Sequence, residues 1–467
     1  MGAQMAHLKA TVSHHEGLQK DVEAVVESAT HGQRMQEALK QDQAKPFQKS
    51  LLRLYLCIFV GYLCSATNGF DSNTFGGLSA MTSFTGYFGI NSNNQGLVAA
   101  LYVIGNIVGS LGAGPCADTW GRKIGMALGS AICVFGAIIQ AAGQNLGMLM
   151  GGRFILGVGA AIVQSAGPAY VVEMSYPKYR GQLTGGFQAC FFLGTIVSTF
   201  LEYGLSYHEA LGSTVWRLPL AIQGLPSVLV LIFVWFIPES PRWYVARDRI
   251  EDARRVLVKY HGDGNPMSKV AALELEEMQA VISDEGGDKR FWDIRGLFNS
   301  RAARHRTFLV ACIAWFAQLD LPPTSYYFPL MVCLSIMTAC TAHQKGNPVV
   351  GDLGIAFLYV FLVVFAFSWT PMQSLYPSEV LAYNDRAKGL AFMNLMVNMA
   401  NVLNTYVPPI GIGNSGWRFY IMYICWDAFG ILVIYLTFVE TSGWNLEEID
   451  QLFHSENPVK RSLQKQE

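Results

Sequence analysis

Charged residues are scarce in this sequence. Asp, Glu, Lys and Arg make up 14% of its 467 residues, whereas about 25% is usual in a soluble domain. Apolar residues make up 51%, and 46 glycines come in addition. A soluble core of this length cannot hide so much apolar surface from water. The composition therefore argues against an ordinary soluble domain.

Motifs of catalysis and nucleotide binding are absent from the sequence. It has no Walker phosphate loop, no HExxH and no Gly-x-Ser-x-Gly, so nothing supports ATP-driven transport, and we expect neither an enzyme nor a cofactor. The nine cysteines lie in apolar stretches without a CxxC pair, which favours buried packing over a disulfide framework or a metal site. A net charge of −1 implies no nucleic-acid partner.

Long apolar stretches are abundant, and they are separated by short polar loops. A helix that crosses a bilayer needs roughly 20 mostly apolar residues. Six stretches meet this requirement before a charged interval, and four meet it afterwards. We therefore expect an all-α integral membrane protein. The expected spans are 53–71, 97–117, 124–143, 147–172, 184–204, 217–237, 307–333, 351–377, 388–410 and 417–438.

Polar segments divide the chain into units. The first 50 residues lack the apolar stretch of a signal peptide. The central interval contains amphipathic patterns at 251–260 and 274–283, which predict short helices, although a plain solvated linker fits as well. The expected units are a cytosolic tail at 1–50, a six-helix bundle at 51–238, a cytosolic linker at 239–306, a shortened helix bundle at 307–439 and a cytosolic tail at 440–467.

Positive charge predicts which loops face the cytosol, because Lys and Arg concentrate in short cytosolic loops. Three loops on one side of the expected membrane carry more Lys and Arg than the loops on the other side. They are 117–124, 173–183 and 384–389. This bias predicts that both termini are cytosolic. The charged residues in these loops that carry the argument are Arg122, Lys123, Lys178, Arg180, Arg386 and Lys388.

The two halves of the chain repeat one another. A Glu is followed seven residues later by an Arg once in each half, at Glu173 with Arg180 and at Glu379 with Arg386. Two repeated halves around a site at mid-membrane are typical of secondary transporters. Two further pairings follow in the same order: Trp216-Arg217 with Trp417-Arg418, and Pro238-Glu239-Ser240 with Val439-Glu440-Thr441.

An ordered set of motifs resembles the sugar porter family of the major facilitator superfamily, especially fungal hexose and disaccharide permeases. The resemblance runs from about residue 53 to 453 and implies two pseudo-repeated helical bundles. Thr119 departs from it by replacing the usual Arg of the first loop motif. The motifs are Gly114 to Lys123, Gly152-Arg153-Phe154 with Glu173 and Arg180-Gly181, Pro238 to Arg242, Trp369-Thr-Pro371 with Glu379 and Arg386, and Glu440 to Glu448.

One segment of the family pattern is missing between Val332 and Cys333. Family members continue there through an eighth span and a second loop motif, so the resemblance implies about ten spans instead of twelve. A gene-model or splicing error explains the gap as well as biology does. In this shortened chain the stretch 307–341 is too long for one span. We therefore expect a helix that breaks near Pro322-Pro323, where a lipid-exposed backbone would lack hydrogen-bond partners, and whose outer end projects beyond the membrane.

Two charged residues inside spans are candidates for proton coupling. Asp71 lies at the end of the first expected span, and Arg153 lies inside the fourth. A charge within a span is costly and usually paired or functional. In proton-coupled sugar porters, the resemblance implies, the matching Asp carries the proton and the matching Arg is its neighbour. The alternative is that Asp71 only caps a helix end.

Charged residues at the cytosolic ends of spans are candidates for gating. The Glu–Arg pair of each half is expected to join an ion network that locks one conformation. Ordinary surface salt bridges, worth about 0–1 kcal/mol, are the alternative; the repetition in both halves favours gating. The expected gating residues are Asp118, Arg122, Glu173, Arg180, Arg242, Glu379 and Arg386.

Sugar recognition requires amide and aromatic side chains in a largely pre-formed cavity. By their spacing from family motifs, five residues are implied as ligands, although single polar residues in spans are often only interhelical hydrogen-bond partners. Leu321-Pro-Pro-Thr replaces a family stretch that holds an Asn ligand, and Ser374 replaces a common Trp, so the preferred sugar is not implied. The expected ligands are Gln188, Gln318, Tyr326, Tyr327 and Asn401.

The leading hypothesis is a monomeric secondary carrier that moves a sugar by alternating access as a proton symporter. It would lie in the plasma membrane, with the sugar, protons and lipid as partners. The alternatives are a proton-independent facilitator, a non-transporting sugar sensor and an inactive shortened form. Sensors of this family carry long cytosolic tails, and only 14 residues follow Phe453. The dependence of uptake on pH separates symporter from facilitator.

Overall fold

The part of the chain that the computed structural model describes is almost entirely helical. Within it, seven helical stretches are long and apolar enough to cross a membrane. The described residues are 34–35, 37–40, 45–208, 212–285, 294–318, 327–343, 349–354, 356–358, 360–361, 376–377, 380–381, 386–439, 452–453 and 458–463.

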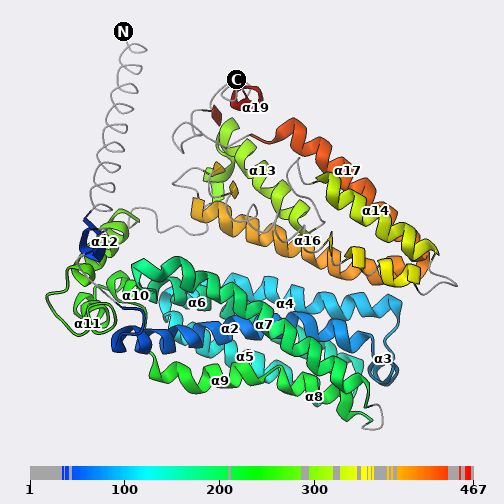
Figure 1. Ribbon diagram of the computed structural model, residues 1–467, viewed down its shortest axis with the longest axis horizontal. Coiled ribbons are helices and arrows are strands. Elements are labelled where there is room, and N and C mark those ends of the chain that lie inside the picture. The colour runs from blue at the N-terminus through cyan, green and yellow to red at the C-terminus, as the bar shows by residue number, and fades with distance from the viewer. Residues whose placement is uncertain are drawn as a thin grey trace.

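The N-terminal half forms one helical bundle, and each of its six expected spans is confirmed (Figure 1). The sixth is interrupted after Ile222, just before Pro226, whose ring removes a backbone donor. The elements are α2 (Lys49–Ser79), α3 (Thr82–Phe88), α4 (Ser92–Thr119), α5 (Arg122–Ala141), α6 (Leu146–Met174), η1 (Pro177–Tyr179), α7 (Arg180–Ser206), α8 (Thr214–Ile222), α9 (Leu225–Phe233) and η3 (Val234–Phe236).

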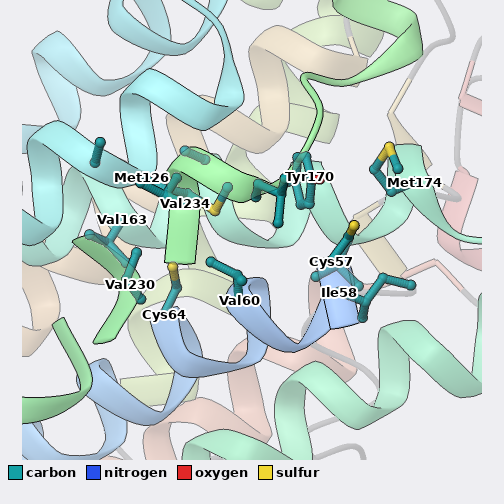
Figure 2. Close-up of a cluster of buried hydrophobic side chains, with 14 of the residues drawn as sticks. Cys57, Ile58, Val60, Cys64, Met126, Val163, Tyr170, Met174, Val230 and Val234 are labelled. Atoms are coloured by element: carbon teal, nitrogen blue, oxygen red, sulfur yellow. The ribbon is translucent and has the colours of Figure 1, made fainter. Parts of the chain in front are cut away.

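The interior of this bundle is filled by aliphatic, sulfur-containing and aromatic side chains. Figure 2 shows Cys64 of α2 and Val163 of α6 converging with Val230 of α9. Six of the nine cysteines are buried, as the apolar surroundings of these residues in the sequence predict. Dispersion contacts among such side chains are individually small but hold the bundle together in sum.

Helix α7 touches the bundle along a narrow stripe. A Cβ added to Gly69 of α2 would lie 1.9 Å from the carbonyl oxygen of Phe191, and one added to Gly194 would lie 2.1 Å from that of Ala66, so only glycine permits this approach of two backbones. Elsewhere α7 is open: 11% of its apolar window is buried, against 50% or more for α2, α4, α5 and α6.

The charged interval between the halves folds into helices α10 (Pro241–Ala246), α11 (Ile250–Tyr260) and α12 (Lys269–Glu285), followed by η4 (Ile294–Phe298). The amphipathic helices expected at 251–260 and 274–283 are confirmed, and a plain solvated linker is not what the structure shows. Their apolar faces form a small core of their own, which contains Val245, Leu257 and Leu275. They lie together at one end of the molecule, opposite α3 (Figure 1).

The described elements of the second half are α13 (Arg301–Gln318), α14 (Tyr327–His343), α16 (Arg386–Ser415), η6 (Gly416–Arg418), α17 (Phe419–Thr437) and the short α19 (Pro458–Leu463). Helices α16 and α17 confirm the spans expected at 388–410 and 417–438. Residues 319–326, with the two prolines at which we expect a break, lie outside the described residues, as does much of 351–377. Leu309, Ile313 and Ile434 lie in the core of this half.

The two halves meet where α4 lies beside α16 (Figure 1). A Cβ on Gly96 would lie 2.3 Å from the carbonyl oxygen of Tyr406, and one on Gly413 would lie 2.7 Å from Cβ of Ser92. Ser92 and Gly96 belong to the first turns of α4, which directly follow α3. The halves are therefore in backbone contact at the α3 end of the molecule, away from α10 to α12.

Candidate transport site and ion network

The two residues expected to couple protons lie buried inside the N-terminal bundle. Asp71 of α2 is fully buried, and Arg153 of α6 is 3% exposed. They lie close enough to interact electrostatically. Neither carboxylate oxygen of Asp71 has a hydrogen-bond partner among the described residues, and neither has the Nη1 atom of Arg153. Asp71 and Arg153 are therefore neighbours, as expected, but they do not form an ion pair in this conformation.

Arg153 is held by other groups in this conformation. Its Nε donates to the carbonyl oxygen of Val98 at 3.1 Å. Its guanidinium lies 4.6 Å from the ring centroid of Phe75 and 5.4 Å from that of Tyr102, where cation–π attraction replaces part of the lost hydration.

One ion pair at the α11 end joins α5 to α6. Arg122 Nε lies 3.1 Å from Glu173 Oε2, and Nη2 donates to Oε1 at 3.2 Å. Ser240 also donates its hydroxyl to Glu173. Glu173 sits in the last turn of α6, where the helix dipole disfavours negative charge, so these donors supply the compensation that the helix end lacks.

Glu239 lies beside this pair and caps the start of α5. Its carboxylate accepts from the backbone N–H of Arg122 at 3.0 Å and of Lys123 at 3.1 Å. Burial raises the pKa of Glu239, while the N–H groups of Ser240, Lys123 and Arg122 and the Arg122 charge oppose that rise. Gly121 precedes these donors with φ +99°, a conformation that favours glycine. The segment after the sixth span is thereby tied to the α4–α5 junction.

A second buried pair ties the helices α11 and α12 to the membrane-spanning bundle. His261 Nδ1 lies 2.5 Å from Glu274 Oε2, and both side chains are almost completely buried. His261 Nε2 lies 3.1 Å from the carbonyl oxygen of Met174, at the end of α6. Arg180, at the start of α7, lies 3.7 Å from Glu274 Oε1.

Glu173 and Arg180 each form an ion pair, but not with one another. Seven residues along a continuous helix would place both on one face, but α6 ends at Met174, Ser175 is extended and η1 intervenes before α7 begins. Arg180 is thereby directed to Glu274 and Glu173 to Arg122. Arg242 is exposed at the start of α10.

Six other predicted gating residues and ligands lie outside the described residues, in whole or in their side chains. The side chains of Asp118 and Arg386 and the whole of Glu379 lie outside the described residues. The same holds for the side chains of Gln318 and Tyr327 and for all of Tyr326. Their roles remain predictions.

Two expected sugar ligands are described. Gln188 is exposed on α7, and no hydrogen bond joins it to another described residue, so interhelical bonding does not occupy it. Asn401 of α16 is half-buried and accepts from the Thr405 hydroxyl at 3.3 Å. Gln188 is therefore available to a ligand, whereas the side-chain oxygen of Asn401 already accepts a hydrogen bond within its own helix.

Sequence reasoning missed three buried groups. Glu202 of α7 is 3% exposed. It is a single acid within the expected span 184–204, and it was not singled out from the sequence. His261 and Glu274 lie in the two amphipathic helices, and their position on the inner face could have been found from the helical period. Asp427 of α17 is also buried.

Comparison with known proteins identifies the family. The family model described as "Sugar (and other) transporter" matches residues 57–329 and 324–453. The MFS-type transporter criB of Aspergillus cristatus is 26% identical over 445 residues, covering 84% of this chain and 92% of that protein. The high-affinity glucose transporter of Kluyveromyces lactis is 24% identical over 490 residues, covering 89% and 88%.

Solved structures show the same fold. The inward open conformation of the xylose transporter XylE from E. coli matches with a TM-score of 0.71 at 19% identity, over 85% of this chain and 99% of that one. The proton:xylose symporter XylE bound to 6-bromo-6-deoxy-D-glucose matches with a TM-score of 0.59 at 18% identity, over 86% and 99%. The helical architecture is that of the major facilitator superfamily, the protein is not an enzyme, and the chain belongs to the sugar (and other) transporter family.

Proposed function

We propose that this protein carries a sugar across the membrane by alternating access, with proton symport. The observation that carries the coupling is the Asp71–Arg153 arrangement. Three buried polar atoms on these two side chains have no hydrogen-bond partner among the described residues, and the two side chains interact electrostatically. Buried charges in a membrane are retained for function by default. The names of the relatives, which include glucose and xylose transporters, support a sugar as the substrate class.

The geometry supports a switch at Arg153. When Asp71 is neutral, Arg153 can remain on Val98 and the rings of Phe75 and Tyr102, as it does here. When Asp71 is ionised, its carboxylate attracts the guanidinium, and the side chain must leave those partners. Because Val98 belongs to α4, this exchange would change how α2, α4 and α6 are joined. A proton on Asp71 would thereby select between two packings of the N-terminal half.

The contact between halves at the α3 end defines one state of the proposed cycle. Gly96 and Gly413 let α4 and α16 approach closely at that end, and we take this approach as the closed side of the carrier. With the α11 end in the cytosol, as the charge bias predicts, the closed end faces outward. The Arg122–Glu173 and Arg180–Glu274 pairs would then act as the cytosolic gate, although the partners seen here all belong to the N-terminal half and the helices that follow it.

Reconstitution into liposomes tests the proposal. A sugar gradient imposed across vesicles that hold a trapped pH dye should drive proton movement in the direction of the sugar. Sugar uptake without proton movement would establish the facilitator, and sugar binding without uptake would establish a sensor or an inactive form. Vesicles without protein give the background leak.

A further inference from the structure

Glu202, a buried carboxyl that the proposed coupling does not use, lies near the α3 end of α7. It belongs to the span Pro177–Ser206 and is 3% exposed. Its polar neighbours are Ser198, one turn earlier on the same helix, and Thr74 on α2. Among the described residues no cation forms an ion pair with it. An isolated acid in this position requires an explanation.

Helix α2 is shaped to receive this carboxyl. A Cβ added to Gly77 would lie 1.8 Å from Glu202 Oε2, so the carboxyl rests directly on the α2 backbone. Gly77 is therefore needed for this contact, as Gly69 is needed two turns away for the contact with Phe191. The close fit between Glu202 and Gly77 indicates that α2 accommodates this carboxyl specifically, and that its burial is not incidental.

Three oxygen–oxygen contacts run from Glu202 to the backbone of α2. Ser198 Oγ lies 2.7 Å from Glu202 Oε1, Thr74 Oγ1 lies 3.1 Å from Ser198 Oγ, and Thr74 Oγ1 lies 2.8 Å from the carbonyl oxygen of Phe70. Each hydroxyl has one hydrogen to donate, and a carbonyl or carboxylate has none. If Glu202 is ionised, three contacts must share two hydrogens.

A proton on the Glu202 carboxyl supplies the third hydrogen that these three contacts need. Glu202 then donates to Ser198, Ser198 to Thr74, and Thr74 to the Phe70 carbonyl, so that every contact has its own donor. The chain of donors ends on the peptide that directly precedes Asp71. An ionised carboxyl in the same place would instead be a buried charge with no cationic partner among the described residues, which is costly.

We propose that Glu202 is a second proton-binding residue of the transporter and holds a proton as a neutral acid in this conformation. The proposal deepens the proton coupling proposed above and rests on it. The other ionisable groups on the helices that pack against α7 toward this end are Asp71 of α2, Arg153 of α6 and Arg217 of α8. Two acids on the α2–α7 side can thus take up protons as the state changes.

Infrared spectroscopy of the purified full chain reads the proton directly, because a protonated carboxyl absorbs apart from a carboxylate and from the amides. We expect one band of a buried protonated carboxyl to be lost in Glu202→Gln and retained in Glu251→Gln, a matched variant of an exposed acid on α11. Glutamine keeps the shape and can donate through its amide. Ser198→Ala should shift this band without removing it, since it removes the acceptor alone.

The outcomes are decisive in either direction. If Glu202→Gln folds and loses no protonated-carboxyl band, the proposal is overturned. If Glu202→Gln does not fold, Ser198→Ala decides: a protonated-carboxyl band that stays unshifted in this variant overturns the proposal. In liposomes, Glu202→Gln should keep sugar exchange and lose sugar-driven proton uptake, and unchanged uptake would also overturn it. Failure of the proposed function is distinct, because the unmodified protein would then move sugar without protons.

Discussion

Asp71 carries the coupling proposal at the level of single residues. Asp71→Asn removes the titratable group and keeps the shape, so sugar-driven proton influx should be abolished while sugar binding is retained. The physical reason is that the amide of Asn cannot gain or lose a proton, so the charge beside Arg153 would no longer change during the cycle. The measurement is proton influx into liposomes beside sugar binding to the purified variant.

Asp427→Asn is the matched control for that experiment, because Asp427 is another buried acid within a span, on α17. It should leave coupling intact. Proton influx that survives in Asp71→Asn would assign this residue to helix packing instead.

Gln188 is the sugar ligand best placed for a test. Its side chain is exposed on α7 and is not used by a described neighbour. Gln188→Ala should weaken sugar binding by about 1–3 kcal/mol, the cost of leaving a buried polar group of the sugar unpaired. Isothermal titration measures the affinity. Gln182→Ala, an exposed glutamine near the start of the same helix, should bind normally; equal affinity in all three proteins would remove Gln188 from the site.

At the scale of elements, the docking of α11 and α12 should depend on pH. Burial lowers the pKa of His261, but the Glu274 carboxylate and the Met174 carbonyl outweigh it, so the pKa is raised above its usual value despite the nearby Arg180 charge. A pKa raised on folding stabilises the protein fully below the unfolded value, about 6.5, and the contribution is lost as pH rises through the folded value.

Hydrogen exchange measures this docking. Amides of α12 (Lys269–Glu285) should be better protected near pH 6 than near pH 8, once intrinsic exchange rates are corrected, by up to about 1.5–3 kcal/mol, the contribution of a hydrogen bond to a charged group. His261→Gln should flatten the difference, while His208→Gln, an exposed histidine after α7, should preserve it. A slope that persists in His261→Gln would show that another group is responsible.

The sequence predicts elements better than pairings. Each span of the N-terminal half is an apolar stretch between polar turns, so its existence follows from length and composition alone. The partner of Glu173 does not follow, because the break after Met174 rotates Arg180 away. The hydrogen-bond chain at Glu202 depends on the close approach of α2 and α7, which no local pattern reveals.

At the scale of the whole molecule, the gap expected after Val332 is predicted to limit activity. The two parts of the family match meet at 324–329, close to that point. We expect sugar uptake from this chain in liposomes to be weak, though measurable above protein-free vesicles, because the expected gap removes one gate loop and one span. Insertion of the corresponding family segment after Val332 should restore uptake, and full uptake by the chain as it stands would show the segment to be dispensable.

The single stripe by which α7 is attached to α2 also predicts a pattern of mutational tolerance. Gly194, Ser198, Glu202 and Leu205 are its buried positions, spaced one helical turn apart. A saturation scan of α7 for protein abundance should therefore show bulkier residues rejected at about every fourth position and accepted between them. Gln188 lies off this stripe, so a substitution there that preserves abundance but removes growth on a sugar would mark a residue kept for the cargo rather than for the fold.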